Sequence, residues 1–78
     1  MSNEQIFFEA IEAERERQDR MWDGPDHDDQ HSRRDWIAFI CREASKADRC
    51  TPGQFETQMV QVAALALAAY ESMRRRPR

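Results

Sequence analysis

The residues that could carry chemistry include a polar set at helical spacing. Its members are Glu14 and Gln18, then Glu43, and then Gln58 and Gln61. Residues three or four apart share one face of a helix. Glutamines on a helix are usually exposed. If the segments that carry these residues pack together, however, their carboxylates and amides form one polar cluster, which could line a ligand pocket.

An acidic segment over 23–31 adds a second set of candidates. His27 and His31 lie four residues apart, but they would point the same way only on a helix, and Pro25 argues against one there. With no third histidine and no cysteine pair, a solvated loop is favoured over a tight transition-metal site. A weaker role remains open, in which His27, Asp28 and His31 rim a ligand pocket.

The segments that position these residues are predicted to be three helices in one domain over residues 1–78. A capping-box pair precedes each helix: Ser2 with Gln5, Ser32 with Asp35, and Thr51 with Gln54. The predicted helices span about 3–21, 33–48 and 52–75. A short connection between the last two favours an antiparallel hairpin. The expected fold is all-α, a helical hairpin plus an N-terminal helix, assembling into a helical-bundle oligomer.

The first predicted helix changes character along its inward face. The stripe begins with Phe7 and Ile11 and continues by helical steps to Glu14 and Gln18. Either the helix projects beyond the core, or its second half lines a polar cavity. Projection is the commoner arrangement. In the second helix, Glu43 shares a face with apolar residues, so its carboxylate needs a partner, a metal ion or water.

The third predicted helix has more apolar surface than one chain can cover. The recurring positions are Phe55, Met59, Val62, Ala66, Tyr70 and Met73. With 78 residues, of which 35% are charged, the chain has little core of its own. We therefore expect a homo-oligomer, a dimer or higher. Cys41 is predicted to be a buried small hydrophobic residue that is not paired with Cys50.

Composition narrows the function classes. No apolar run approaches the roughly 20 residues of a membrane span. The net charge of −3, with no basic face interleaved with aromatic residues, disfavours nucleic-acid binding. Two cysteines are too few for the disulfide framework of a small secreted protein. These features predict a cytoplasmic protein.

Three further segments have distinctive residue patterns. The sequence reads ERxRQDxxW over 14–22, GPxHDDxH over 24–31 and QVAALA over 61–66. These motifs resemble those of small phage and prophage proteins, which implies the cytoplasm of the host as the location if a phage encodes the chain. That group is similar to the MazG-like all-α nucleoside triphosphate pyrophosphatases. The resemblance implies a helical oligomer and a magnesium site built from two carboxylate pairs, E-x-x-E and E-x-x-D, on consecutive helices.

The chain departs from that pattern at the metal ligands. The corresponding pairs are Glu43-x-x-Lys46 and Gln58-x-x-Gln61, so one carboxylate of four remains. Magnesium prefers anionic oxygens, and an ammonium group repels it. We assign no cofactor and lean against an enzyme. If the chain were an enzyme that binds magnesium, Glu43 would be its catalytic residue, and the metal ligands would come from Glu43, Asp28 and Asp29.

Three functions are therefore weighed. The first is an oligomeric protein that sequesters a nucleotide or nucleotide-derived defence signal without hydrolysing it. In that function Lys46 and Arg42 would contact phosphate, the amides would read base or ribose edges, and Trp22 or Trp36 would stack. The second is an active magnesium-dependent nucleotide pyrophosphatase. The third is an acidic inhibitor that binds a host protein, such as a defence factor, through Asp26, Asp28 and Asp29.

Overall fold

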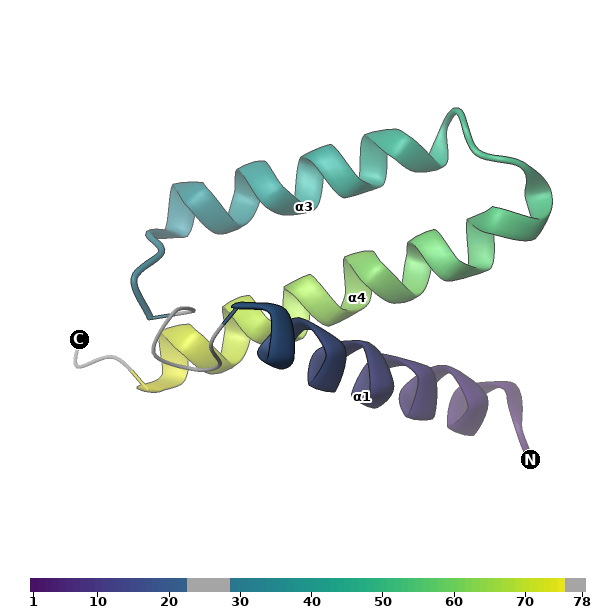
Figure 1. Cartoon of the computed structure of the whole chain (residues 1–78), viewed down its shortest axis with the longest axis horizontal. Helices are drawn as coiled ribbons and strands as arrows, with labels where there is room; N and C mark the ends of the chain where they lie inside the picture. The colour runs from purple at the N-terminus through teal and green to yellow at the C-terminus, as the bar shows by residue number, and fades with distance from the viewer. Residues whose placement is uncertain (23–28, 76–78) are drawn as a thin grey trace.

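The fold was analysed in a computed structural model, which describes residues 1–22 and 29–75. The described chain is all-α, as predicted, and contains α1 (Asn3–Trp22), α3 (Arg33–Ala47) and α4 (Pro52–Arg75). Figure 1 shows α3 and α4 side by side, with α1 alongside α4 on its other flank. The helix limits lie within one residue of those expected from the sequence.

Each described helix begins at the capping box that the sequence indicates. Gln5 N donates to Ser2 Oγ at 3.2 Å, and Ser2 N donates to Gln5 Oε1 at 3.1 Å. The same reciprocal bonds join Ser32 with Asp35 and Thr51 with Gln54. Each box satisfies two backbone N–H groups that the first helical turn leaves without partners. Local sequence thus fixes where the helices start.

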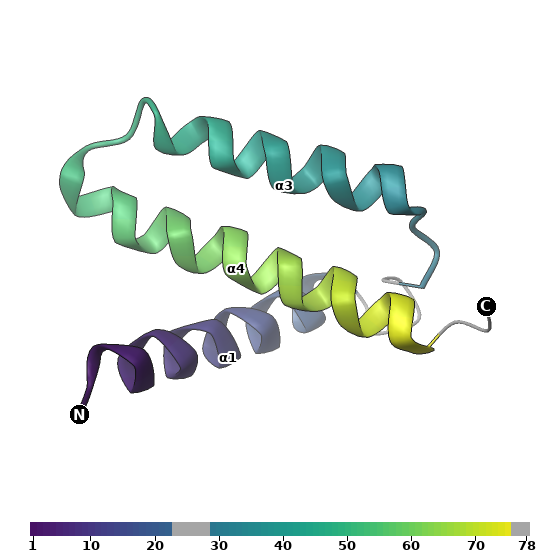
Figure 2. The ribbon, with the colours of Figure 1, turned by 180° about the vertical axis from the view of Figure 1, so that it is seen from behind.

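The short connection between α3 and α4 produces the antiparallel hairpin that was expected (Figure 1). Both α3 and α1 pack on α4, whereas no close backbone approach joins α1 to α3 within the described residues. Seen from behind, α4 lies in front of α1 (Figure 2). The helix α4 is therefore the central element, and a gap separates the two helices that flank it.

The buried centre of this fold is small. Ala64, Ala68 and Ser72, spaced four residues apart on α4, are at most 1% exposed. Such a row of small side chains allows neighbouring helices to approach closely. Trp36 of α3 is 4% exposed and is the one large apolar residue among the described residues that is fully inside. The prediction that Cys41 is buried is wrong: its thiol is exposed and free, because it lies on the outer side of α3.

The polar half of the first helix is buried more deeply against the rest of the molecule than its apolar half. Gln18 is only 9% exposed, whereas Ile6 and Phe8 are 51% and 57% exposed. The expectation that the polar half projects beyond the core is therefore wrong. Because the N-terminal end of α1 diverges from α4 (Figure 1), Ile6 and Phe8 lack a covering neighbour within the described protomer, whereas Ile11 is half-buried.

Large apolar side chains are also exposed on the other helices, including Ile37 of α3 and Phe55 and Tyr70 of α4. None of the helices in the described residues combines the length and the apolar character that a membrane crossing requires.

Candidate functional site

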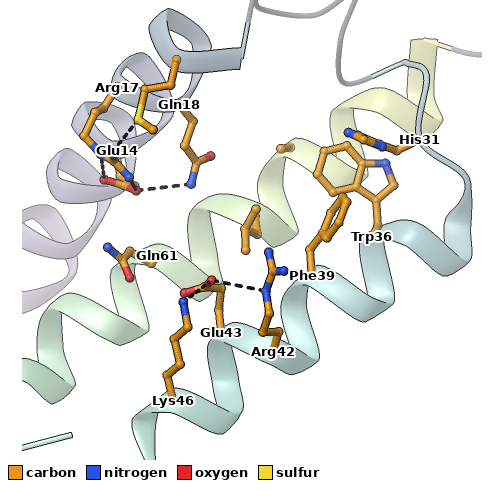
Figure 3. A pocket seen from close by; sticks show the side chains of 13 residues that line it. Glu14, Arg17, Gln18, His31, Trp36, Phe39, Arg42, Glu43, Lys46 and Gln61 are labelled. Atoms are coloured by element: carbon orange, nitrogen blue, oxygen red, sulfur yellow. Dashed lines mark hydrogen bonds and ion pairs between the residues drawn. The ribbon is translucent and has the colours of Figure 1, made fainter.

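The gap between α1 and α3 is a groove with α4 as its floor. Its volume is about 510 Å³, within the range of small-molecule sites. Figure 3 shows side chains of α1 and α3 that face each other across it, with Gln61 of α4 between them. The lining residues are Glu14, Arg17, Gln18 and Met21 on the α1 side, His31, Trp36, Phe39, Arg42, Glu43 and Lys46 on the α3 side, and Gln61, Leu65 and Ala68 on the floor.

Glu43 is the carboxylate on the α3 wall, and its side chain is 16% exposed. Lys46 Nζ donates to Glu43 Oε1 at 3.0 Å, and Gln58 Nε2 donates to Oε2 at 2.9 Å and to the Glu43 backbone carbonyl at 2.8 Å. Burial acts to raise the pKa of Glu43, but the bonds from Gln58 and Lys46 and the positive charge of Lys46 outweigh it and lower the pKa. Glu43 is therefore ionised and already neutralised by its neighbours.

Glu14 is the matching carboxylate on the α1 wall, with a side chain 12% exposed. Arg17 binds it through two bonds, from Nε at 2.8 Å and from Nη2 at 2.6 Å, and Gln18 Nε2 donates to it at 3.3 Å. The bond from Arg17 lowers the pKa of Glu14, although the charge of Glu43 across the groove acts in the opposite direction. The two carboxylates thus lie close enough to interact, and each has a cation of its own helix beside it.

The other end of the groove is aromatic (Figure 3). The rings of His31, Trp36 and Phe39 meet edge to face, with centroids 5.0 to 6.0 Å apart. Such contacts hold aromatic side chains in fixed orientations. The indole Nε1 of Trp36 is buried and has no hydrogen-bond partner among residues 1–22 and 29–75. The groove therefore has an apolar, aromatic end and a charged end.

Basic side chains outnumber acidic ones along the groove. Its lining contains Arg17, Arg42 and Lys46 but only two carboxylates, whereas the whole chain has a net charge of −3. Arg42 is 68% exposed, and its guanidinium lies over the Phe39 ring at 5.8 Å. Because the carboxylates are bound by their own cations and amides, the groove can accept an anion that brings further negative charge.

Of the residues that sequence analysis selected as ligand-binding candidates, eight line the groove: Glu14, Gln18, His31, Trp36, Arg42, Glu43, Lys46 and Gln61. Gln58 does not line it, because its amide nitrogen is directed to Glu43 from behind the wall. His27, Asp28 and the side chain of Trp22 lie outside the described part of the chain.

Asp29 lies away from the groove lining and has a structural role. Its carboxylate accepts bonds from Ser72 Oγ at 3.1 Å and from Arg75 Nη2 at 2.7 Å. The side chain of Ser72 is fully buried. These bonds attach the segment before α3 to the C-terminal end of α4, so Asp29 and Glu43 are not brought to one site.

Sequence reasoning did not select five lining residues: Arg17, Met21, Phe39, Leu65 and Ala68. Their spacing carries a signal, since the first three each lie three residues after a selected residue, and the last two lie four and seven residues after Gln61. Extending every selected position by one or two helical turns would have found them.

The site does not fit a magnesium ion. The four positions of the carboxylate pattern hold Glu43, Lys46, Gln58 and Gln61, and the single carboxylate among them is bound by an ammonium group and an amide. Nowhere in residues 1–22 and 29–75 are three histidine, cysteine, aspartate or glutamate side chains grouped as metal ligands. Comparison of the chain with protein-family models, curated proteins and solved structures finds no match.

Proposed function

We propose that the groove binds a nucleotide or a nucleotide-derived signal and holds it without hydrolysing it. The observation that carries this proposal is the state of Glu14 and Glu43. Each carboxylate already accepts bonds from a basic side chain and from an amide. Such groups are poor metal ligands, and the basic side chains beside them favour an anion.

The two ends of the groove match the two parts of a nucleotide. Phosphate groups suit the end that holds Lys46, Arg42 and Arg17, because basic side chains bind phosphate through charge-assisted hydrogen bonds. A heterocyclic base suits the end with Phe39 and the buried Trp36, whose edge-to-face rings make that end of the groove apolar. The amides of Gln18 and Gln61 lie in the groove, and an amide can both donate to and accept from a base or a ribose.

The resemblance to small phage proteins supports the biological part of the proposal. A phage protein that retains a nucleotide would lower its free concentration in the host, which suits the sequestration of a defence signal. We also propose that the working form is a homo-oligomer, because Ile6, Phe8 and Tyr70 expose more than half of their surface in the protomer.

The first experiment is a search by mass spectrometry for nucleotides that are released when the purified protein is denatured, followed by calorimetric titration with the compounds found and with linear and cyclic nucleotides. Arg42→Gln and Lys46→Gln are each expected to weaken binding about tenfold or more, since each removes a charge-assisted hydrogen bond. Arg34→Gln is the matched control, because Arg34 is exposed on the same helix and does not line the groove. If no nucleotide binds, or if Arg34→Gln weakens binding as much as Arg42→Gln does, the proposal fails.

The same material tests the two other functions. Release of pyrophosphate from any nucleoside triphosphate with magnesium or manganese, abolished by Glu43→Gln, would establish the pyrophosphatase instead. Capture of a host protein that is lost when Asp26, Asp28 and Asp29 are neutralised would establish the acidic inhibitor.

A further inference from the structure

The side of α4 that faces away from the groove carries an apolar stripe. We call it the back face of α4 and define it by Phe55, Met59, Ala63, Ala66 and Tyr70. At 3.6 residues per turn, these positions lie roughly opposite the buried seam formed by Ala64 and Ala68. Phe55 and Tyr70 are 47% and 62% exposed, Ala66 is exposed, and Met59 and Ala63 are half-buried. Neither α1 nor α3 covers α4 in the view of Figure 2.

We propose that this back face binds the back face of a second copy, in an antiparallel pair of α4 helices related by a two-fold axis. The proposal adds the surface and the symmetry to the oligomer proposed above. A face can bind its own copy when its pattern is self-complementary about its midpoint. Here two small residues, Ala63 and Ala66, stand at the centre, and large ones stand on both sides.

The spacing of the stripe is self-complementary in this sense. In an antiparallel pair, residues at equal distances from the axis face each other. An axis level with the midpoint of positions 64 and 65 sets Ala63 against Ala66 of the second copy, and Met59 against Tyr70. The same axis leaves Phe55 level with Arg74, so the self-complementary part of the stripe runs from Met59 to Tyr70. The alanines let the two backbones approach closely, and the longer side chains then pack on each other at both ends.

The charges beside the stripe are complementary under the same axis. Glu56 and Arg74 lie on one flank of the back face, near its two ends. In an antiparallel pair the same flanks of the two helices meet, so Glu56 of each copy comes close to Arg74 of the other. The contact is thus flanked by two opposite-charge pairs, whereas a parallel pair would bring opposite flanks together and separate Glu56 from Arg74 of the other copy.

The solvent-exposed area of the protomer is also consistent with burial of one face against a second copy. A folded monomer of 9.3 kDa exposes about 5,000 Å² by the usual scaling with mass, whereas this protomer exposes 5989 Å². The excess of about 1,000 Å² is close to the roughly 800 Å² that each partner buries in an interface of standard size. Because the groove opens away from this face, pairing leaves both grooves of the dimer accessible.

Sedimentation equilibrium tests the pair directly. Wild-type protein is expected at twice the chain mass of 9.3 kDa. Ala66→Glu is expected to give monomer, because it places a carboxylate at the centre of the contact. Ala38→Glu makes the same change at an exposed alanine of α3 and is expected to stay dimeric. Wild-type protein at the monomer mass, or an Ala66→Glu variant that remains dimeric, would overturn the proposal.

A charge exchange tests the register without changing the centre of the contact. Glu56→Arg is expected to raise the dimer dissociation constant about tenfold, because two attractive pairs become repulsive. The double variant Glu56→Arg with Arg74→Glu restores the pairs and is expected to return the constant to within about twofold of wild type. Failure of the double variant to recover would refute the antiparallel register. Nucleotide titration of the same samples separates the two proposals, since a dimer that binds no nucleotide refutes only the function of the groove.

Discussion

Replacing Gln58 by leucine would test how the α3 wall of the groove is held. The variant removes the donor that bonds Glu43 Oε2 at 2.9 Å and the Glu43 carbonyl at 2.8 Å. A bond to a charged group contributes roughly 1.5–3 kcal/mol and a neutral one roughly 0.5–1.5 kcal/mol. We expect the free energy of unfolding to fall by about 2–4 kcal/mol at neutral pH, a large part of the roughly 4–12 kcal/mol typical of a chain of this length.

The sign of the pH dependence follows from the pKa of Glu43. This pKa is lower in the folded protein than in the unfolded chain. The stabilisation is therefore fully present above the unfolded pKa of about 4.3, and it is lost as the pH falls through the folded value. Burial raises the pKa of Glu43, and the bond from Gln58 lowers it. Without that bond, the effect of burial is less opposed, so the folded pKa of Glu43 rises in the variant. The difference in stability between wild type and Gln58→Leu should shrink in acid.

Urea unfolding followed by circular dichroism, at one protein concentration and at neutral and acidic pH, measures both effects. Gln30→Leu is the control, since it makes the same substitution at an exposed turn residue outside the groove. NMR titration of Glu43 in both proteins gives the pKa directly. A loss below about 0.5 kcal/mol, typical of a surface substitution, or a loss that is equally large in acid would refute this account of Glu43.

Other substitutions probe the rest of the fold by thermal or urea unfolding. Ser32→Ala removes a capping box and should lower stability by about 1 kcal/mol. Asp29→Ala leaves the buried hydroxyl of Ser72 without this acceptor and should cost about 1–3 kcal/mol, whereas Asp29→Asn, which keeps an acceptor oxygen, should cost less. Trp36→Ala should cost about 3–5 kcal/mol, because it empties the centre of the aromatic end. Phe8→Ala should change protomer stability by less than about 0.5 kcal/mol, and an effect as large as that of Trp36→Ala would contradict the exposure of this half of α1.

The features that depend on local sequence could be predicted. Helix starts follow from bonds within four residues, so the pairs at Ser2, Ser32 and Thr51 indicated the helix starts and the turn between α3 and α4. The polar pairs at helical spacing also led to most of the groove. Their faces were fixed by the helical period, and the short hairpin left one way to bring Glu43 beside Gln58.

The features that depend on which apolar face is covered could not be predicted. Apolar residues occupy several faces of α3 and α4, and periodicity does not say which face a neighbour covers. Cys41 was placed inside for this reason, and the seam of Ala64, Ala68 and Ser72 was not distinguished from the rest of α4. The inward half of α1 was also misjudged. A buried glutamine is uncommon, but Gln18 has Glu14 beside it as a hydrogen-bond acceptor, and that pairing makes its burial acceptable.

The separation of α1 from α3 has a consequence for how the protein folds and responds. Since each of the two packs only on α4 within the part of the chain that the structure describes, the hairpin of α3 and α4 is a local unit that can form before α1 docks. Detachment of α1 from α4 then costs less free energy than global unfolding. Amide hydrogen exchange would detect it as weaker protection in α1 than in α4. A molecule that spans the groove from Arg17 to Lys46 contacts both walls only while α1 is docked. Its binding energy therefore adds to the stability of the docked helix, and the two equilibria are thermodynamically linked.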